Sequence, residues 1–195
     1  MGMPSETTGW TVAMVQALPD DGKRYEVIDG ELLVTPAPTW RHQRAAFELA
    51  VRIREFLGSQ PVAEVIVAPA DVQYDERTLV EPDLFVVPLV EGRKPRDFRE
   101  AGRLLLAVEI LSLSTARADR HTKRRLYQRQ GVPEYWIVDL DARLIERWRP
   151  EDVRPEILTE RIEWRPLPAA GELEIDLSGY FADMGPSIRG ISPAI

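Results

Sequence analysis

The spacing of apolar residues predicts three helices. Residues 41–57, "RHQRAAFELAVRIREFL", have apolar side chains at helical intervals, which indicates a long helix with one broad buried face. A short helix is expected over 10–18 and another over 116–130. Ser114 or Thr115 is the expected cap of that last helix, because a hydroxyl there can accept from the first free N–H groups.

Runs of apolar residues between turn signals predict the strands. The segment 25–34, "YEVIDGELLV", indicates a hairpin that turns at Asp29 and Gly30. Further strands are expected at 63–69, 70–76, 79–87, 103–111, 134–141 and 143–149, and near 156–164 and 172–177, before a terminal turn or short helix. This order predicts an α/β (α+β) fold, with a central mixed β-sheet flanked by helices and an N-terminal β-hairpin. Neither a repeat nor a long linker divides the chain, so one domain over 1–195 is expected.

Composition narrows the class of protein. The chain has 195 residues, of which 44% are hydrophobic and 29% charged, and it contains no cysteine. These values are ordinary for a globular domain and exclude a disulfide scaffold and a thiolate metal site. The start "MGMPSETTGW" does not resemble a signal peptide, and no apolar run approaches the roughly 20 residues that cross a bilayer. We therefore expect a cytoplasmic protein without membrane association.

The charge distribution points in two directions. A net charge of −7 counts against tight, purely electrostatic binding of nucleic acid, which needs a cationic surface. Residues 117–129, "RADRHTKRRLYQR", nevertheless carry six Lys or Arg residues against one Asp. This segment is either a local basic patch or a solvated helix face.

Carboxylates within two apolar strands are the first sign of chemistry. Glu81 and Asp83 interrupt the run 79–87, which otherwise indicates one buried strand, and Glu109 interrupts 103–111. An ionised carboxylate in an apolar interior must be paired, protonated or bound to a metal. Convergence of Asp83 and Glu109 would suit Mg²⁺, which prefers oxygen ligands. The alternative is two separate salt bridges at strand ends.

The last predicted helix offers a cation. Asp119, Lys123 and Tyr127 recur at intervals of four and therefore share one helix face. If this face points to the end of the Glu109 strand, Lys123 lies beside the carboxylates. The alternative is an exposed Asp–Lys pair next to a half-buried tyrosine, worth only about a few tenths of a kcal/mol.

A set of segments resembles a known family. In order, they are "YEVIDGELLV", His42, "EPDLFVV", "VEILSLS", the Asp119–Lys123–Tyr127 spacing and "GVPEYWIVD". Over about residues 20–150 this set resembles the Uma-type restriction endonuclease family of the PD-(D/E)XK nuclease superfamily. The resemblance implies a four-stranded mixed sheet core flanked by helices. It also implies metal-dependent hydrolysis of phosphodiester bonds, here of DNA.

The resemblance also implies a metal site. The superfamily's "PD" falls on Pro82 and Asp83, and its "(D/E)X" falls on Glu109 and Ile110. Asp83, Glu109 and the backbone carbonyl of Ile110 would then hold one or two Mg²⁺ ions, which Mn²⁺ could replace. Glu81 is expected to point the other way from Asp83, to solvent or a salt bridge.

The remaining implied residues are less regular. Leu111 stands where the superfamily has its lysine, and Lys123 is the candidate replacement that orients the attacking water. Glu31 is expected to complete the metal shell, with Glu26 as a competitor. His42 would contact phosphate or a metal-bound water, or else only start its helix.

Other expectations are weaker. Asp71 is either a supporting carboxylate or a strand-end partner, and His121 is expected to be exposed and without a role. Trp136, Trp148 and Trp164 are expected in the core rather than in an interface. A homodimer would suit a double-strand cut, since two sites would face each other across a twofold axis. The competing hypothesis is a catalytically inactive nuclease fold that acts as a nucleic-acid-binding or assembly module.

Overall fold

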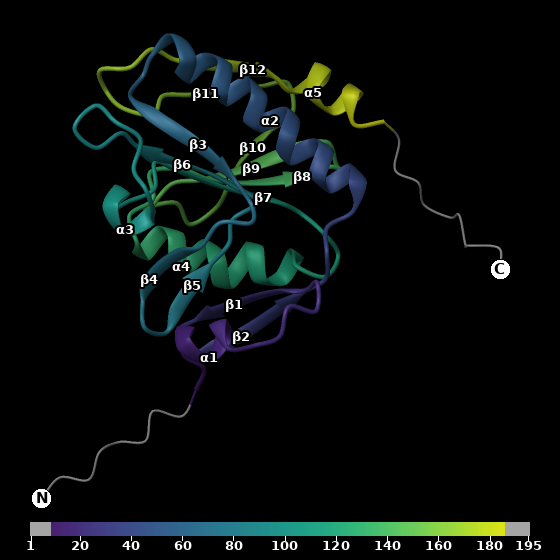
Figure 1. Cartoon of the computed structure of the whole chain (residues 1–195). Helices are drawn as coiled ribbons and strands as arrows, with labels where there is room; N and C mark the ends of the chain where they lie inside the picture. Colours follow the sequence, from purple (N-terminus) through teal and green to yellow (C-terminus); the bar gives the residue numbers. More distant parts are fainter. Residues whose placement is uncertain (1–8, 186–195) are drawn as a thin grey trace, which may run out of the picture.

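A six-stranded mixed sheet forms the centre of the computed structural model, which describes residues 9–185 (Figure 1). Its strand order is β10 (Glu156–Leu158), β9 (Leu144–Trp148), β8 (Tyr135–Asp139), β7 (Leu106–Ile110), β6 (Leu84–Pro88) and β3 (Ala63–Val67). β7 and β8 are parallel, and the other neighbours in this sheet are antiparallel. The predicted central mixed sheet is confirmed, with more strands than the four of the expected core.

A smaller sheet contains the predicted hairpin. Its order is β2 (Glu31–Thr35), β1 (Arg24–Ile28), β5 (Thr78–Val80) and β4 (Val72–Asp75), and α1 (Val12–Gln16) packs against β1. The hairpin turns at Asp29 and Gly30, whose φ angles of 52° and 85° are both positive. Such angles suit the Asp-Gly turn that the sequence indicated. A third sheet pairs β11 (Arg161–Trp164) with β12 (Leu173–Asp176).

Helices cover both faces of the central sheet (Figure 1). The long α2 (Trp40–Ser59) lies on one face together with α5 (Leu177–Asp183), while α4 (Arg124–Arg129) lies on the other face. A short helix, α3 (Phe98–Ala101), packs against β4 and β6. Alternate residues of each strand supply the two cores. On β6, Leu84 and Val86 face α2, whereas Phe85 and Val87 belong to the core that includes α4.

The predicted continuous strand over 79–87 is wrong. β5 ends at Val80 and β6 begins at Leu84, and the two strands belong to different sheets. Pro82 lies in the break, where its missing N–H group is not needed by a ladder. Asp83 therefore emerges at the junction of the two sheets, next to the start of β6.

The predicted helix over 116–130 has two parts. Its first part is a π-helical segment, η1 (Ala118–Lys123), and α4 follows directly. The predicted cap is wrong, because Ser112 performs that role: its Oγ accepts from the N–H of Thr115 at 3.3 Å, and its carbonyl accepts from Ala116 at 3.0 Å. The helical turn begins earlier than the apolar pattern indicated. π-Segments are uncommon and often occur at functional sites.

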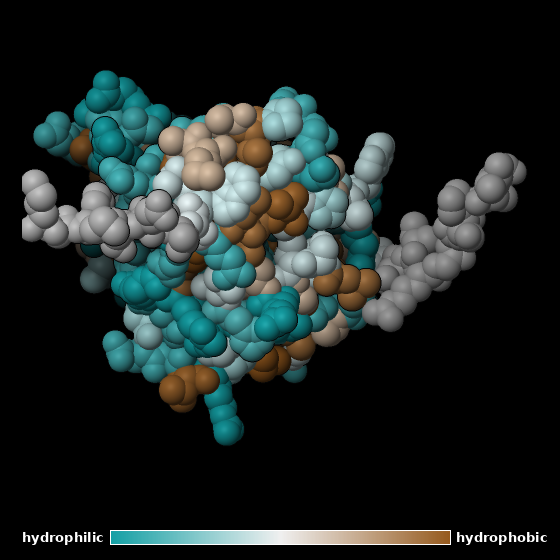
Figure 2. All heavy atoms as spheres, turned by 90° about the horizontal axis from the view of Figure 1, so that it is seen from below, coloured by the Kyte–Doolittle hydropathy of each residue, from teal (hydrophilic) through white to brown (hydrophobic). Residues whose placement is uncertain are grey.

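The core and the surface agree with a globular domain. Trp136, Trp148 and Trp164 are buried, as expected for core packing. Viewed from the hairpin side, the surface is mixed, with hydrophobic side chains gathered near its middle and hydrophilic ones around them (Figure 2). Across residues 9–185, none of the helices combines the length and the apolar character needed to span a bilayer.

Candidate catalytic site

A pocket of about 580 Å³ lies where the hairpin, the start of α2, the end of β7 and η1 meet. Its lining includes charged side chains from all four of these regions and from the β5–β6 and β8–β9 connections. They are Arg24, Glu26, Arg41, His42, Asp83, Glu109, Arg120, Lys123, Asp139 and Asp141. The pocket therefore combines residues that lie more than 100 positions apart in the sequence.

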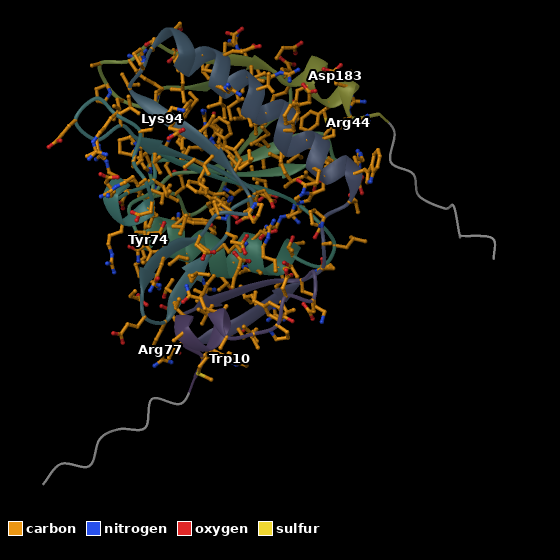
Figure 3. The ribbon with its side chains drawn as sticks, in the orientation of Figure 1. Trp10, Arg44, Tyr74, Arg77, Lys94 and Asp183 are labelled. Atoms are coloured by element: carbon orange, nitrogen blue, oxygen red, sulfur yellow. The ribbon has the colours of Figure 1, made fainter. Side chains whose placement is uncertain are left out.

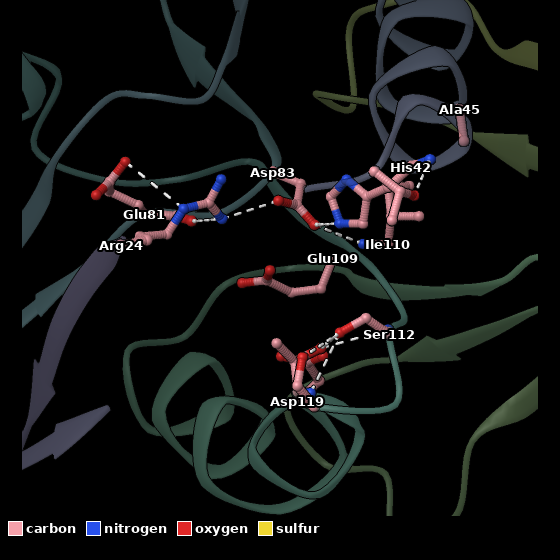
Figure 4. Close-up of polar contacts among 12 residues, drawn as sticks. Arg24, His42, Ala45, Glu81, Asp83, Glu109, Ile110, Ser112 and Asp119 are labelled. Carbon is pink, nitrogen blue, oxygen red and sulfur yellow. Dashed lines mark hydrogen bonds and ion pairs between the residues drawn. The ribbon is translucent and has the colours of Figure 1, made fainter. Parts of the chain in front are cut away.

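Asp83 is held by three partners at the bottom of this pocket (Figure 4). Its Oδ1 accepts a hydrogen bond from Arg24 Nη1 at 2.9 Å. Its Oδ2 accepts from the backbone N–H of Ile110 at 2.8 Å and lies 3.0 Å from His42 Nε2. Burial raises the pKa of Asp83, but the hydrogen bonds and positive charges of His42 and Arg24 outweigh it and hold the pKa at about 2. Asp83 is therefore an anion at neutral pH.

Glu109 faces the α4 side of β7, as alternation with Ala107 dictates. Its Oε1 accepts hydrogen bonds from Lys123 Nζ at 2.9 Å and from the Tyr127 hydroxyl at 3.3 Å. Burial raises the pKa of Glu109 well above its ordinary value; the Lys123 charge opposes this shift and the Asp83 charge adds to it. Burial therefore opposes the charged form of Glu109, and Lys123 supports it.

Lys123 is itself enclosed by carboxylates. Its Nζ lies 2.8 Å from Glu26 Oε2, 2.9 Å from Glu109 Oε1 and 3.9 Å from Asp119 Oδ1. Burial lowers the pKa of Lys123, but the surrounding negative charges outweigh it and raise the pKa above its ordinary value. Burial also raises the pKa of Asp119 to about 6, against the opposing charge of Lys123. The predicted helix face therefore points inward, and the basic segment contributes a buried ammonium group rather than only a solvated surface.

Four of the predicted site residues meet at the pocket: His42, Asp83, Glu109 and Lys123. Glu31 does not join them. It lies exposed at the turn end of the hairpin, opposite Ile28 and about 7 Å along the strand direction from the position of Glu26. The alternative, Glu26, lies within the pocket, fully buried.

Other expected residues take different positions. The backbone N–H of Ile110 donates to Asp83, while its carbonyl stays a predicted metal ligand. Asp71 is largely exposed and does not line the pocket. Partial burial of its carboxyl raises its pKa. His121 is exposed, as expected, and Glu81 lies in a salt bridge with Arg24 at 3.8 Å, one of the two expected arrangements.

Arg24 is one of the charged pocket residues that the sequence reasoning missed; the others are Arg41, Arg120, Asp139 and Asp141. Arg24 stands two positions before Glu26 on β1, so both side chains project from the same face of the hairpin. Alternation from Glu26 could have indicated it. The contact with Asp83, 59 positions away, is a property of the tertiary structure alone.

The donor chemistry of the pocket suits a hard divalent cation. Glu26, Asp83, Glu109 and Asp119 are buried carboxylates, and the cations among them are Lys123 and Arg24. Such an excess of negative charge favours a bound metal with oxygen ligands. Within residues 9–185, however, no three His, Cys, Asp or Glu side chains are grouped closely enough to hold an ion as they stand.

Comparisons with known proteins agree with this fold. Residues 12–178 match the family model Uma2, whose description is "Putative restriction endonuclease". The crystal structure of "a putative nuclease belonging to DUF820 from Anabaena variabilis" superposes with a TM-score of 0.68 at 21% identity, covering 90% of this chain and 99% of that one. At this identity the similarity shows the fold alone. Comparison with curated proteins gives no match.

Proposed function

The chain belongs to the Uma2 family, and on this basis we propose that it is a metal-dependent nuclease that hydrolyses phosphodiester bonds of DNA. The observation that carries the proposal is the convergence of Asp83, Glu109 and Lys123 in one pocket from three different elements. Its members do not neutralise one another, which distinguishes them from ordinary surface ion pairs.

Asp83 and Glu109 are the proposed ligands of Mg²⁺, which Mn²⁺ could replace. The bound ion would lower the pKa of a coordinated water and stabilise charge on the scissile phosphate. Ile110 fixes the orientation of Asp83 through its N–H group, and His42 supports the same carboxylate. Lys123 donates to the water or to the developing negative charge. Glu26, which lines the pocket and pairs with Lys123, replaces Glu31 as the candidate that completes the metal shell.

One further candidate function has specific support. An inactive nuclease fold that binds nucleic acid or assembles with partners would explain the net charge of −7 and the leucine at position 111. The ion pairs of Asp83 and Glu109 would then be structural. A homodimer is compatible with either function.

Cleavage of single- and double-stranded DNA in Mg²⁺ or Mn²⁺, with RNA in parallel, separates these functions. We expect Asp83→Asn and Glu109→Gln each to reduce cleavage at least about 100-fold, as for loss of a group that stabilises transition-state charge. Lys94→Gln is the matched control. Lys94 is exposed, pairs with Glu64 and lies on the α3 side of the molecule, away from the pocket (Figure 3). Folded wild-type protein that cleaves no substrate in either metal would favour the inactive module.

A further inference from the structure

Arg24 connects the two acidic residues of the β5–β6 connection. In Figure 4 its guanidinium lies between Glu81 and Asp83. Nη1 donates to Asp83 Oδ1 at 2.9 Å and to the backbone carbonyl of Glu81 at 3.1 Å, while Nε lies 3.8 Å from Glu81 Oε2. The guanidinium thus has a short bond to one carboxylate and a long contact with the other.

The bond to Asp83 competes with any metal there. A carboxylate offers about four lone-pair positions. Three positions of Asp83 are already taken, by Arg24, by the Ile110 N–H and by His42. A divalent ion would also experience the positive charge of Arg24, which is close enough to interact with Glu109 as well.

Of these three partners, Arg24 is the one that can leave. The Ile110 N–H belongs to the backbone of a central strand, and His42 is anchored in the first turn of α2. Arg24 is a long side chain with 18% of its surface exposed to the pocket. Its departure needs neither a strand nor a helix to shift.

Glu81 provides a second pairing site for the guanidinium of Arg24. Its side chain is 15% exposed, and among residues 9–185 the ion-pair partner of its carboxylate is Arg24, at 3.8 Å. A movement of about 1 Å would bring that contact to hydrogen-bond distance. Both pairing sites keep the guanidinium paired, so neither requires a buried, uncompensated charge.

We propose that Arg24 is a metal-exchangeable latch: it pairs with Asp83 in the metal-free protein and transfers to Glu81 when a divalent cation binds Asp83. Arg24 and Glu81 are then positioning residues that set the metal affinity of the site. This inference rests on the proposed function, since it takes Asp83 as a metal ligand. It also explains why two carboxylates stand so close together at this connection: Asp83 receives the metal and Glu81 receives the displaced arginine.

Calorimetric titration with Mn²⁺ in the absence of DNA tests the latch. Arg24→Gln removes the competing cation, and we expect roughly tenfold tighter Mn²⁺ binding. Glu81→Gln removes the second pairing site, and we expect roughly threefold weaker binding. In the double variant Glu81 has no arginine to receive, so its loss should have little further effect. The Mn²⁺ affinity of the double variant should therefore lie within about twofold of that of Arg24→Gln alone. A merely structural pair would weaken binding in both single variants.

Two controls address charge and folding. Arg41→Gln removes another arginine that lines the pocket but pairs with Asp141 at 2.7 Å, and it should leave Mn²⁺ affinity nearly unchanged. Arg24→Lys keeps a cation beside Asp83 and should bind close to wild type. If Arg24→Gln is too unstable at 25 °C, the rise in its melting temperature on adding Mn²⁺ replaces calorimetry, and that rise should exceed the wild-type one.

The outcomes separate the latch from the function it rests on. If the wild type binds Mn²⁺ and Arg24→Gln binds it equally or more weakly, the latch is overturned. The proposed metal site is not affected by that result. Equal tightening in Arg24→Gln and Arg41→Gln also overturns the latch, because net charge would then explain the effect. Failure of both wild type and Arg24→Gln to bind Mn²⁺ overturns the latch and the metal-dependent function together.

Discussion

The pocket and the Arg147 cluster hold charges in opposite ways. On β9, Arg147 donates to Glu156 Oε2 from Nε at 3.0 Å and from Nη2 at 2.7 Å, and Arg149 donates to the same oxygen at 3.1 Å. Glu134 approaches Arg147 at 3.8 Å. Two arginines therefore face two glutamates, and the Glu156 side chain remains 43% exposed. This cluster is balanced in charge, and Arg149 and Glu156 are exposed to water, whereas Arg147 and Glu134 are mostly buried.

The buried carboxylates around Lys123 and Arg24 are neither balanced by these two cations nor exposed. Among the described residues, Glu26, Asp83, Glu109 and Asp119 are each at most 4% exposed, and they share Lys123 and Arg24. A buried excess of negative charge opposes folding unless a cation compensates it. The difference teaches that balanced ion pairs join elements of the fold. The stability of the fold alone does not explain why an excess of negative charge is buried. The following predictions test this contrast in order of expected effect.

Lys123→Met should produce the largest loss of stability. It leaves Glu26 and Glu109 buried without their cation, which in comparable cases costs about 3–5 kcal/mol. Urea unfolding at pH 7 measures the change. Adding Glu26→Gln to this variant should recover part of the loss, because one uncompensated charge is removed. A loss below about 1 kcal/mol would show that the pocket is as tolerant as the surface.

Asp119→Asn should act in the opposite direction. The pKa of Asp119 is about 6 in the folded protein against an ordinary value of 3.8. The folded state therefore holds the proton more tightly than the unfolded chain does. This stabilises the folded state fully below pH 3.8, and the stabilisation is lost as pH rises through 6. The asparagine variant lacks this loss. Its stability relative to wild type should therefore increase between pH 4 and pH 6 and then level off, by about 3 kcal/mol at most. A difference that does not change across this range contradicts the assignment.

Arg147→Met should have an intermediate effect. The variant loses charge-assisted hydrogen bonds to Glu156 and the bond to the Glu163 carbonyl, but water can solvate the exposed Glu156. We expect a loss of about 1–2 kcal/mol in urea unfolding. A loss as large as that of Lys123→Met would remove the contrast between the two regions.

Arg149→Gln should have the smallest effect. The Arg149 side chain is 44% exposed and its partner is similarly wet. Surface pairs of this kind contribute about 0–1 kcal/mol, so the free energy of unfolding should change by less than about 0.5 kcal/mol. The residual contribution should also fall as salt is added, which a titration with NaCl checks. Insensitivity to salt together with a larger loss would place Arg149 among the structural residues.

Local periodicity predicted much of the site correctly. The apolar run 103–111 singled out the lone carboxylate of Glu109, and the helical spacing of Asp119, Lys123 and Tyr127 identified the face that meets it. These patterns succeed because each extends over one element, where the backbone fixes the direction of every side chain. The segment resemblance added Asp83 and His42. The same local reasoning predicted one strand over 79–87, because an apolar run has the same pattern in one strand as in two, although Pro82 marks a strand start or an irregularity there.

By itself the sequence determined the mixed sheet, its covering helices, the family and the candidate residues of each element, because hydrophobic period and short motifs are properties of neighbouring positions. Only the tertiary structure decided that Glu26 rather than Glu31 reaches Lys123, and that Arg24 occupies Asp83. Both outcomes depend on how the hairpin docks beside the central sheet. That docking is fixed by contacts between segments more than 50 residues apart, such as the bond from Glu81 N–H to Glu26, which no local pattern encodes.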